Sequence, residues 1–326
     1  MSLLKRRGCD VKMKLMTAVI ALAVAMGLSA VAPSGRAEAQ EMTKIRVGYI
    51  PVGVYSYFWR ARDAGYFKDE HLEIELVPMA GGGQIIPALQ SGALQFGISD
   101  ALGVLNARNG GIPVTYVSFN FQQTSADPVH AVLTMDPAIK TAADLKGKSV
   151  ATNLSYNTDW TMMRAWLRKQ NVDLKTVTFR EIPFPDMLPA IRNNTVAAVG
   201  ATEPFVTLGK EQGARVLGYY FTDVQSPNVL SGIVAMLPYV DKNRDVVRRF
   251  LHAVNRAIDD FKDPKIVRQT IAANTKSPPA VIEKMNIGEW SKNVPPETMQ
   301  FWIDAAKTEG VINATADLNG LVWQDK

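Results

Sequence analysis

The chain has little of the chemistry that most disulfide-bonded, metal-binding and nucleophilic proteins require. Its 326 residues include one cysteine, Cys9, and three histidines, His71, His130 and His252. A single cysteine cannot form an intramolecular disulfide, and no cluster of histidines and acidic residues has the spacing of metal ligands. The sequence also has no repeat at solenoid periods. These absences exclude a disulfide scaffold, a repeat protein and a recognisable metal site.

No apolar run reaches the roughly 18 residues that a membrane-spanning helix needs. The run at 15–28 (LMTAVIALAVAMGL) follows five lysines and arginines, and a small-residue tail follows it and ends in Ala37-Glu38-Ala39. This order is typical of a secretory signal peptide. We therefore expect residues 1–39 to be removed near Ala39 and the mature protein to be periplasmic. The pair Arg6-Arg7 leaves the choice between Sec and twin-arginine export open.

The chain has little excess charge once this leader is set aside. The net charge is +5, from 36 basic and 31 acidic residues. The leader contains six of the basic and two of the acidic residues, which leaves 30 and 29, or about +1. Such a balance gives no basic surface for nucleic acid. Cys9 lies in the leader too, so the mature chain has no thiol.

The remaining residues alternate between short apolar strands and amphipathic helices. This βαβ order predicts an α/β fold with mostly parallel sheets flanked by helices. The expected strands are 45–50, 72–78, 96–99, 114–119, 131–134, 149–153, 177–182, 197–202 and 215–220, and the expected helices are 56–64, 84–90, 100–108, 159–170, 186–193, 205–212 and 245–261.

The helical C-terminal segment has no strands of its own in this interpretation, so it needs a sheet to pack on. The simplest solution returns it to the first α/β unit. We therefore expect a discontinuous lobe 1 (40–140 with 230–326) and an inserted lobe 2 (141–229). Two chain crossings, near 137–141 and 225–232, would then form a hinge suited to closing on a small ligand.

Ligands of open α/β sheets bind beyond the carboxyl ends of the strands. Most loops at those ends lead into helix N-termini, where free backbone N–H groups favour an anion. Tyr55, Tyr156 and Phe184 lie in such loops, where core packing explains an aromatic less well, and we expect one or two of them to line a slot. The candidate ligand-binding residues are Val54, Tyr55, Gly82, Gly83, Ser99, Asp100, Phe121, Ser155, Tyr156, Asn157, Thr158, Phe184 and Glu203.

Several of these candidates have a second interpretation that the sequence leaves open. The glycines at 81–83 could approach a ligand or simply form a turn. Asp100 could be only the N-cap of its helix, and one of Ser155, Asn157 and Thr158 must be a cap. Glu203 could accept a hydrogen bond from the ligand or form a salt bridge at the hinge.

A serine hydrolase is an alternative from a different class of protein. The stretch Gly97-Ile98-Ser99-Asp100-Ala101 faintly resembles a nucleophile elbow, but alanine replaces its last glycine. None of the three histidines is placed by the sequence as a base for Ser99. We therefore expect no catalytic residues, no cofactor and no metal.

Several segments together resemble a known family. They are IRVGY at 45–49, AGYF at 64–67, GGG at 81–83, LQSG at 89–92, FGIS at 96–99, DLKGK at 144–148 and EPF at 203–205. In this order they are similar to the substrate-binding proteins of ABC importers for nitrate, sulfonate, taurine and bicarbonate (the NitT/TauT group). The resemblance covers residues from about 45 to 232, and it extends more loosely to the C-terminus.

The resemblance implies a two-lobed type II periplasmic-binding fold, a small ligand gripped between the lobes, and delivery to a permease in the inner membrane. We expect a monomer that captures an anionic organic molecule, sulfonate-like or aromatic carboxylate-like. The same group includes binders of thiamine-pyrimidine precursors, which is the alternative ligand class. The related fungal pyrimidine synthases carry a cysteine-rich motif that this mature chain lacks. Ligand sensing without transport also stays open.

Overall fold

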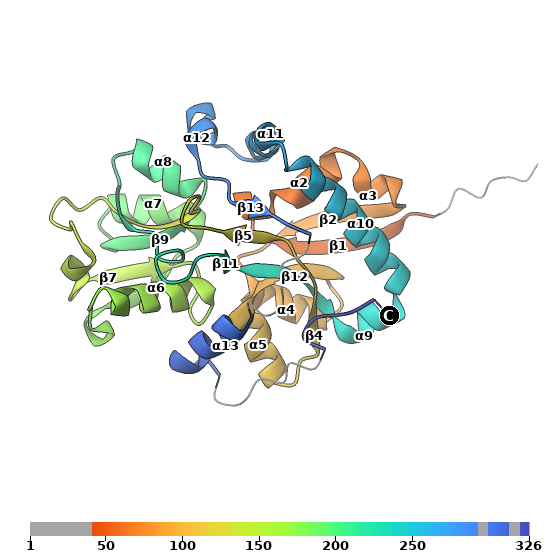
Figure 1. The fold of residues 1–326 in the computed structure, drawn as a ribbon, viewed down its shortest axis with the longest axis horizontal. Helices are drawn as coiled ribbons and strands as arrows, with labels where there is room; N and C mark the ends of the chain where they lie inside the picture. Colours follow the sequence, from red (N-terminus) through yellow and green to blue (C-terminus); the bar gives the residue numbers. More distant parts are fainter. Residues whose placement is uncertain (1–40, 293–298, 313–319, 326) are drawn as a thin grey trace, which may run out of the picture. The chain divides into compact units, whose positions relative to one another are not determined.

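Two five-stranded sheets organise the chain (Figure 1). The computed structural model describes residues 41–292, 299–312 and 320–325, and the expected signal peptide lies outside them. Residues Met42–Lys326 form one compact unit. We call the two sheets sheet I and sheet II.

Sheet I has the strand order β2-β1-β3-β12-β4. Its strands pair in parallel except β12, which is antiparallel to both neighbours. The central strands are almost entirely apolar and buried because helices cover the sheet. The strands are β1 (Thr43–Tyr49), β2 (Leu72–Pro78), β3 (Phe96–Asp100), β4 (Val114–Phe119) and β12 (Ser231–Met236).

Sheet II has the order β10-β6-β9-β7-β8. Here β6 is the strand that runs against the others, so in each sheet four strands share one direction and one is reversed. The expected mostly parallel sheets are confirmed in this sense. The strands are β6 (His130–Thr134), β7 (Ser149–Thr152), β8 (Thr178–Glu181), β9 (Ala198–Thr202) and β10 (Arg215–Gly218).

The two reversed strands correct the sequence-based assignment of the crossings. We expected 131–134 in the first sheet and no strand after 230, yet β6 belongs to sheet II and β12 lies inside sheet I. The first crossing therefore precedes His130 instead of lying at 137–141. Both strands are buried along nearly their whole length, and an apolar run of this kind does not say which sheet it enters.

The chain crosses between the sheets through a small third sheet. Its order is β11-β5-β13, and β5 pairs antiparallel with both neighbours. Figure 1 shows β5 and β11 side by side between the two larger sheets. The strands are β5 (Phe121–Gln123), β11 (Asn228–Val229) and β13 (Glu289–Trp290). None of these three short strands was predicted from the sequence.

Helices flank both sheets, and the seven helices with expected bounds all begin within two residues of the expected positions. None of the helices in the described residues has the length and apolar character needed to cross a membrane. They are η1 (Gly53–Tyr55), α2 (Ser56–Asp63), α3 (Tyr66–Asp69), α4 (Gly82–Gln90), α5 (Ala101–Asn109), η2 (Ala142–Leu145), α6 (Thr158–Lys169), η3 (Leu174–Thr176), α7 (Phe184–Arg192), α8 (Phe205–Glu211), α9 (Leu237–Lys242), α10 (Arg244–Asp260), α11 (Pro264–Asn274), α12 (Pro279–Lys284) and α13 (Met299–Thr308).

The C-terminal helix α10 packs on the first α/β unit, as the sequence analysis expected. Its Phe250 is fully buried, and its ring stacks on that of Phe96 with centroids 4.0 Å apart. Phe67 and Phe58 lie on the same ring at 5.5 and 6.2 Å. An aromatic cluster therefore joins α10 to β3, α2 and α3, and completes the core of this half of the chain.

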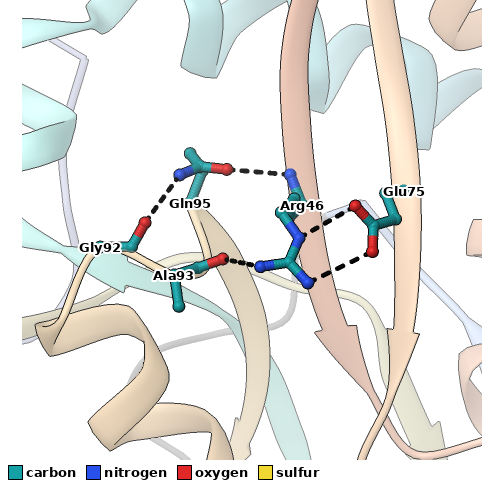
Figure 2. Close-up of polar contacts among 5 residues, drawn as sticks. All are labelled: Arg46, Glu75, Gly92, Ala93 and Gln95. Atoms are coloured by element: carbon teal, nitrogen blue, oxygen red, sulfur yellow. Dashed lines mark hydrogen bonds and ion pairs between the residues drawn. The ribbon is translucent and has the colours of Figure 1, made fainter.

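One polar cluster fixes the register at the outer edge of sheet I. Arg46 of β1 lies opposite Glu75 of β2, and its guanidinium donates to both carboxylate oxygens, at 2.9 and 3.2 Å (Figure 2). The same guanidinium donates to the Ala93 carbonyl at 2.9 Å, and the Arg46 amide donates to Gln95, whose own amide reaches Gly92. The ion pair is partly exposed, so it contributes no more than about 1 kcal/mol and mainly selects one pairing.

A glycine on β12 allows the reversed strand to enter sheet I. A Cβ on Gly232 would lie 2.5 Å from the Ser118 carbonyl oxygen and 2.7 Å from the Tyr116 ring. We expect Gly232→Ala to lower the free energy of unfolding by about 1–3 kcal/mol, measured by urea denaturation, because the backbone must shift.

Gly83 is the matched control for this substitution. A Cβ there would meet no atom within 4 Å, and the residue lies in the first turn of α4. Gly83→Ala should leave stability unchanged or raise it by up to about 1 kcal/mol. If both variants lose the same free energy of unfolding, the close packing of β12 does not explain why glycine is needed at position 232.

Candidate functional site

A cavity lies where the carboxyl ends of the strands of sheet I face those of sheet II. Sheet I contributes residues that follow β1 and β3, and sheet II contributes residues at the ends of β7 and β9, as the rule for open α/β sheets predicts. Its volume is about 20 Å³, which is enough for one water molecule. The lining residues are Ile50, Val52, Val54, Tyr55, Gly81, Gly82, Ile98, Asp100, His130, Asn153, Asn157, Thr158, Asp159, Phe184, Thr202 and Leu230.

Two wider pockets, of about 360 and 310 Å³ by the same measure, adjoin this cavity. The first shares Gly82, Asp100 and Asn157 with it and extends along Ser155 and Tyr156. The second shares the Phe184 ring and is bounded by prolines. The central cavity and its two neighbours together run along the line where the two sheets face each other.

Asp100 ends β3 and caps α5, as predicted. Its Oδ1 accepts from the backbone N–H groups of Leu102 and Gly103 at 3.1 and 3.0 Å. The backbone N–H of Thr158, at the start of α6 on the other sheet, also favours the charged form of this carboxylate and lowers its pKa. Burial nevertheless raises the pKa of Asp100, which these hydrogen bonds only partly offset. Asp100 is therefore both a cap and a wall of the cavity.

Asp159 contributes a second carboxyl group from the first turn of α6. The residue is buried, and the Tyr220 hydroxyl donates to its Oδ1 at 2.5 Å. Burial raises the pKa of Asp159 to about 7, with a further contribution from the charge of Asp100. Burial also lowers the pKa of His130, on the same cavity, to about 3, so this imidazole is neutral and cannot balance the carboxylates.

Tyr55 and Phe184 form the aromatic part of the wall. Tyr55 is buried, and its hydroxyl lies 2.9 Å from the Ser231 Oγ, which connects η1 to β12. Burial raises the pKa of the Tyr55 phenol, so it stays a neutral hydrogen-bonding group. Val54 lies beside it in the wall. Two of the three expected slot aromatics therefore reach the cavity.

The loop before α6 confirms that one of its polar residues is a cap. The Asn157 Oδ1 accepts from the Trp160 N–H at 3.0 Å, and its amide nitrogen donates to Asn153. The Tyr156 side chain is 62% exposed and lies against the Trp160 ring at the mouth of the larger pocket. Ser155 lines that pocket too.

The glycine segment is the beginning of a helix instead of the expected loop. Gly82 and Gly83 are the first residues of α4. A Cβ on Gly82 would lie 2.5 Å from the Ser99 Oγ and 3.6 Å from the Asp100 Oδ2. Glycine at this position lets the start of α4 pack directly against the end of β3, and in this way places both elements at the cavity.

Three candidates do not line any of the three pockets. Ser99 is fully buried beneath the start of α4, and its hydroxyl donates to the Asp100 carbonyl at 3.3 Å. Phe121 is buried in β5 against Trp290. Their loop positions in the sequence suggested exposure to a ligand, but both side chains point into packed regions.

Glu203 also lies away from the cavity, beside the crossings. Its carboxylate accepts from the Thr207 N–H at 3.0 Å, the Thr207 hydroxyl at 2.8 Å and the Asn286 N–H at 3.3 Å. Burial raises the pKa of Glu203 to about 7. The side chain therefore joins α8 to the segment before β13. This agrees with the interpretation that Glu203 lies at the hinge, but its partners are hydrogen-bond donors and not a basic side chain.

Four polar residues that line the central cavity were not predicted from the sequence: Asn153, Asp159, His130 and Thr202. An acidic residue in the first helical turn normally indicates only a favourable interaction with the helix dipole, which is why Asp159 gave no signal. His130 and Thr202 face each other across the β6–β9 pairing, which the sequence did not predict. Knowledge of that pairing would have placed both at the cavity.

The charges of this site are unusual for an anion-binding protein. The lining residues that the structure describes include two aspartates and no lysine or arginine in any of the three pockets. Within the described residues no group of three or more His, Cys, Asp and Glu side chains could hold a metal ion. The site offers carboxylates, amides, hydroxyls and aromatic surface.

Comparisons with known proteins agree on the fold. Residues 54–265 match the family model described as NMT1/THI5 like. A protein of Escherichia coli K12 named as an aliphatic sulfonates-binding protein is 22% identical over 282 residues, which cover 86% of this chain and 85% of that protein. A protein of Brachyspira hyodysenteriae named as an ABC transporter periplasmic binding protein is 23% identical, over 79% of this chain and 77% of that one.

A solved structure gives the same result in three dimensions. The alkanesulfonate-binding protein SsuA from Xanthomonas axonopodis pv. citri, bound to MOPS, superposes with a TM-score of 0.73. The match covers 87% of this chain and 99% of that structure at 19% identity. At this identity the likeness shows the fold, which is the two-lobed periplasmic-binding type.

Proposed function

Because this chain belongs to the NMT1/THI5-like family, we propose that it is the extracytoplasmic solute-binding protein of an ABC importer. The resemblance to the NitT/TauT group that the sequence analysis stated is confirmed. The observation that carries the proposal is the cavity between the two sheets, to which the carboxyl ends of both contribute. Once the halves move apart, the residues of this cavity can contact a small solute from both sides at once.

We infer that the two sheets are the centres of two lobes. Lobe 1 would hold the chain before β5 and the chain from β12 onward, and lobe 2 would hold residues from about 130 to 227. The paired strands β5 and β11 would be the hinge, since they are the connections that run side by side. This division moves the first boundary about ten residues earlier than the sequence predicted.

The proposal requires the lobes to separate when a solute enters. A space of about 20 Å³ holds a water molecule, whereas small-molecule sites commonly need several hundred Å³. Contacts between the two halves would have to open: Asp100 with the Thr158 N–H, Lys284 with Glu211 at 2.8 Å, and Glu309 with Arg164 at 2.6 Å. A solute bound to both halves would favour closure.

We infer that the solute is bound without covalent chemistry. The packing of the Ser99 hydroxyl under α4, where it donates to a backbone carbonyl instead of a histidine, supports this inference against a serine hydrolase. The names of the relatives support a sulfonate-like organic solute as the ligand class. A membrane permease as partner and a periplasmic location are proposed on the same grounds.

A thermal-denaturation screen tests the proposed function. The chain from Gln40 onward should be melted with alkanesulfonates, aromatic carboxylates, aminopyrimidines and amino-sulfonates, each in large excess. A true solute at a hundredfold excess over its Kd adds about 2.7 kcal/mol to the free energy of unfolding, which raises Tm by several degrees. Hits are confirmed by calorimetry at a stoichiometry of one. A screen in which no small molecule of these classes shifts Tm would contradict solute capture.

A further inference from the structure

The cavity between the sheets is lined by two carboxyl groups, and its lining among the described residues includes no lysine or arginine. Asp100 comes from β3 of sheet I and Asp159 from α6 of sheet II, and both line the same 20 Å³ space. His130 on the same wall is neutral. Two charged carboxylates in a buried, poorly hydrated space repel each other and lose hydration, so without a cation the raised pKa of Asp159 keeps part of this carboxyl group protonated, and a bound cation would favour both charged forms.

A separate observation indicates that the space is built for a hydrogen-bonding group. The Thr202 side chain, at the end of β9, lines the cavity and is 1% exposed. Its Oγ1 has no hydrogen-bond partner among the described residues. A buried hydroxyl without a partner costs about 1–3 kcal/mol, and a ligand group in the cavity can supply the missing bond. Thr202 and the two carboxylates are therefore three acceptors that converge on one small volume.

The wall around these acceptors is aromatic and apolar. Tyr55, Phe184 and Leu230 line the cavity, so a flat or hydrocarbon body attached to the recognised group would find apolar surface. A sulfonate placed at the same depth would face two carboxylates with no lysine or arginine to balance it. The charge of the site is thus opposite to that of the head group in the relatives' names.

Resting on the proposed function, we propose that the solute enters this cavity with a positively charged nitrogen group, an ammonium or amidinium, that is held between the Asp100 and Asp159 carboxylates and the Thr202 hydroxyl. A cation with several N–H donors satisfies all three acceptors and relieves the repulsion between the carboxylates. An acidic group elsewhere on the same solute is compatible with this, because it would lie outside the cavity.

Matched probes on one scaffold test the proposal by calorimetry on the mature chain. The pairs are benzamidine with benzenesulfonate and propylamine with propanesulfonate, and 3-aminopropanesulfonate combines both groups. We expect the cationic member of each pair to bind at least tenfold more tightly than the anionic member. If 3-aminopropanesulfonate binds more tightly than propylamine, the solute also uses an acidic group outside the cavity.

Isosteric variants assign the effect to the two aspartates. Asp159→Asn keeps an acceptor for the Tyr220 hydroxyl, and Asp100→Asn keeps the cap of α5, so both should fold, which circular dichroism checks. Each should weaken binding of the cationic probes at least tenfold. Asp304→Asn, on the exposed surface of α13, is the matched control and should leave binding unchanged. Thr202→Val should weaken the same probes by a smaller factor.

The outcomes separate this proposal from the proposed function. If the wild type binds the sulfonates more tightly than the cationic probes, the cation site is overturned and solute capture stands. The same holds if neutralising the aspartates does not raise the affinity for the sulfonates above that of the wild type. Cation binding that is equal in Asp159→Asn, Asp100→Asn and the wild type overturns it as well. Absence of binding by every probe, together with a screen without hits, contradicts the proposed function itself.

Discussion

Replacing Phe250 by alanine is expected to lower the free energy of unfolding by about 3–5 kcal/mol, measured by urea denaturation. The Phe250 ring is fully buried between α10 and sheet I, and three other aromatic rings lie on it, that of Phe96 at 4.0 Å. Truncation leaves a cavity that rigid strands and helices on both sides cannot close. The loss should appear as a lower denaturation midpoint with an unchanged slope.

The control for this effect is Arg248→Ala, two residues away on the exposed face of α10. Its ion pair with Asp325 is exposed on both sides, so the loss should be within about 1 kcal/mol. Similar small losses in both variants would mean that α10 does not complete the core of sheet I. The division of the chain into two halves, one of them discontinuous, would then be wrong.

Replacing Glu203 by glutamine is expected to remove part of the pH dependence of stability. Burial raises the pKa of Glu203 from 4.5 to about 7, so between these values the folded protein keeps a proton that the unfolded chain has released. The contribution of Glu203 is therefore most favourable below pH 4.5 and is lost as pH rises to about 7. For this shift, Glu203 lowers the free energy of unfolding by about 3 kcal/mol at pH 8 relative to pH 4.5.

The measurement compares the free energy of unfolding of variant and wild type at pH 5 and pH 8. Glutamine loses one acceptor for the Thr207 N–H, which lowers stability at every pH, so the difference between the two pH values is the readout. Asp159 changes stability in the same direction and His130 in the opposite one, but both are present in both proteins. The control Glu211→Gln removes an exposed carboxylate of α8. If the free energy of unfolding of Glu203→Gln depends on pH as that of the wild type does, the raised pKa of the buried Glu203 carboxyl group is contradicted.

The alternation of apolar residues was sufficient to predict most of the fold. Strand β2 was predicted with the bounds that it has, the cap Asp100 followed from local rules, and the cap of α6 was narrowed to three residues, of which Asn157 is the one observed. The reversed strands β6 and β12 were assigned wrongly because a buried apolar run has no feature that names its partner sheet. The three strands of the crossing have two or three residues each, too few for a period to show.

Only part of the candidate site was predicted, because some of its residues depend on how the two sheets pack against each other. Residues at the ends of parallel strands, such as Val54, Tyr55 and Asp100, follow from topology and reached the cavity. Asp159 and Thr202 depend on how α6 and β9 lie relative to sheet I, which only tertiary packing decides. The helix N-termini in the sequence favoured an anionic solute, and no local pattern indicated that two carboxylates would converge from different sheets.

Closure of two lobes on a solute is tested most directly by a distance between them. The chain from Gln40 onward has no cysteine, so single cysteines at Ser91, after α4, and Lys175, in η3, can carry spin labels on exposed positions of the two halves. With the solute that gives the largest shift in Tm, we predict that the distance distribution measured by pulsed electron paramagnetic resonance becomes shorter and narrower. A solute that binds at a stoichiometry of one and leaves this distribution unchanged would contradict capture by closure.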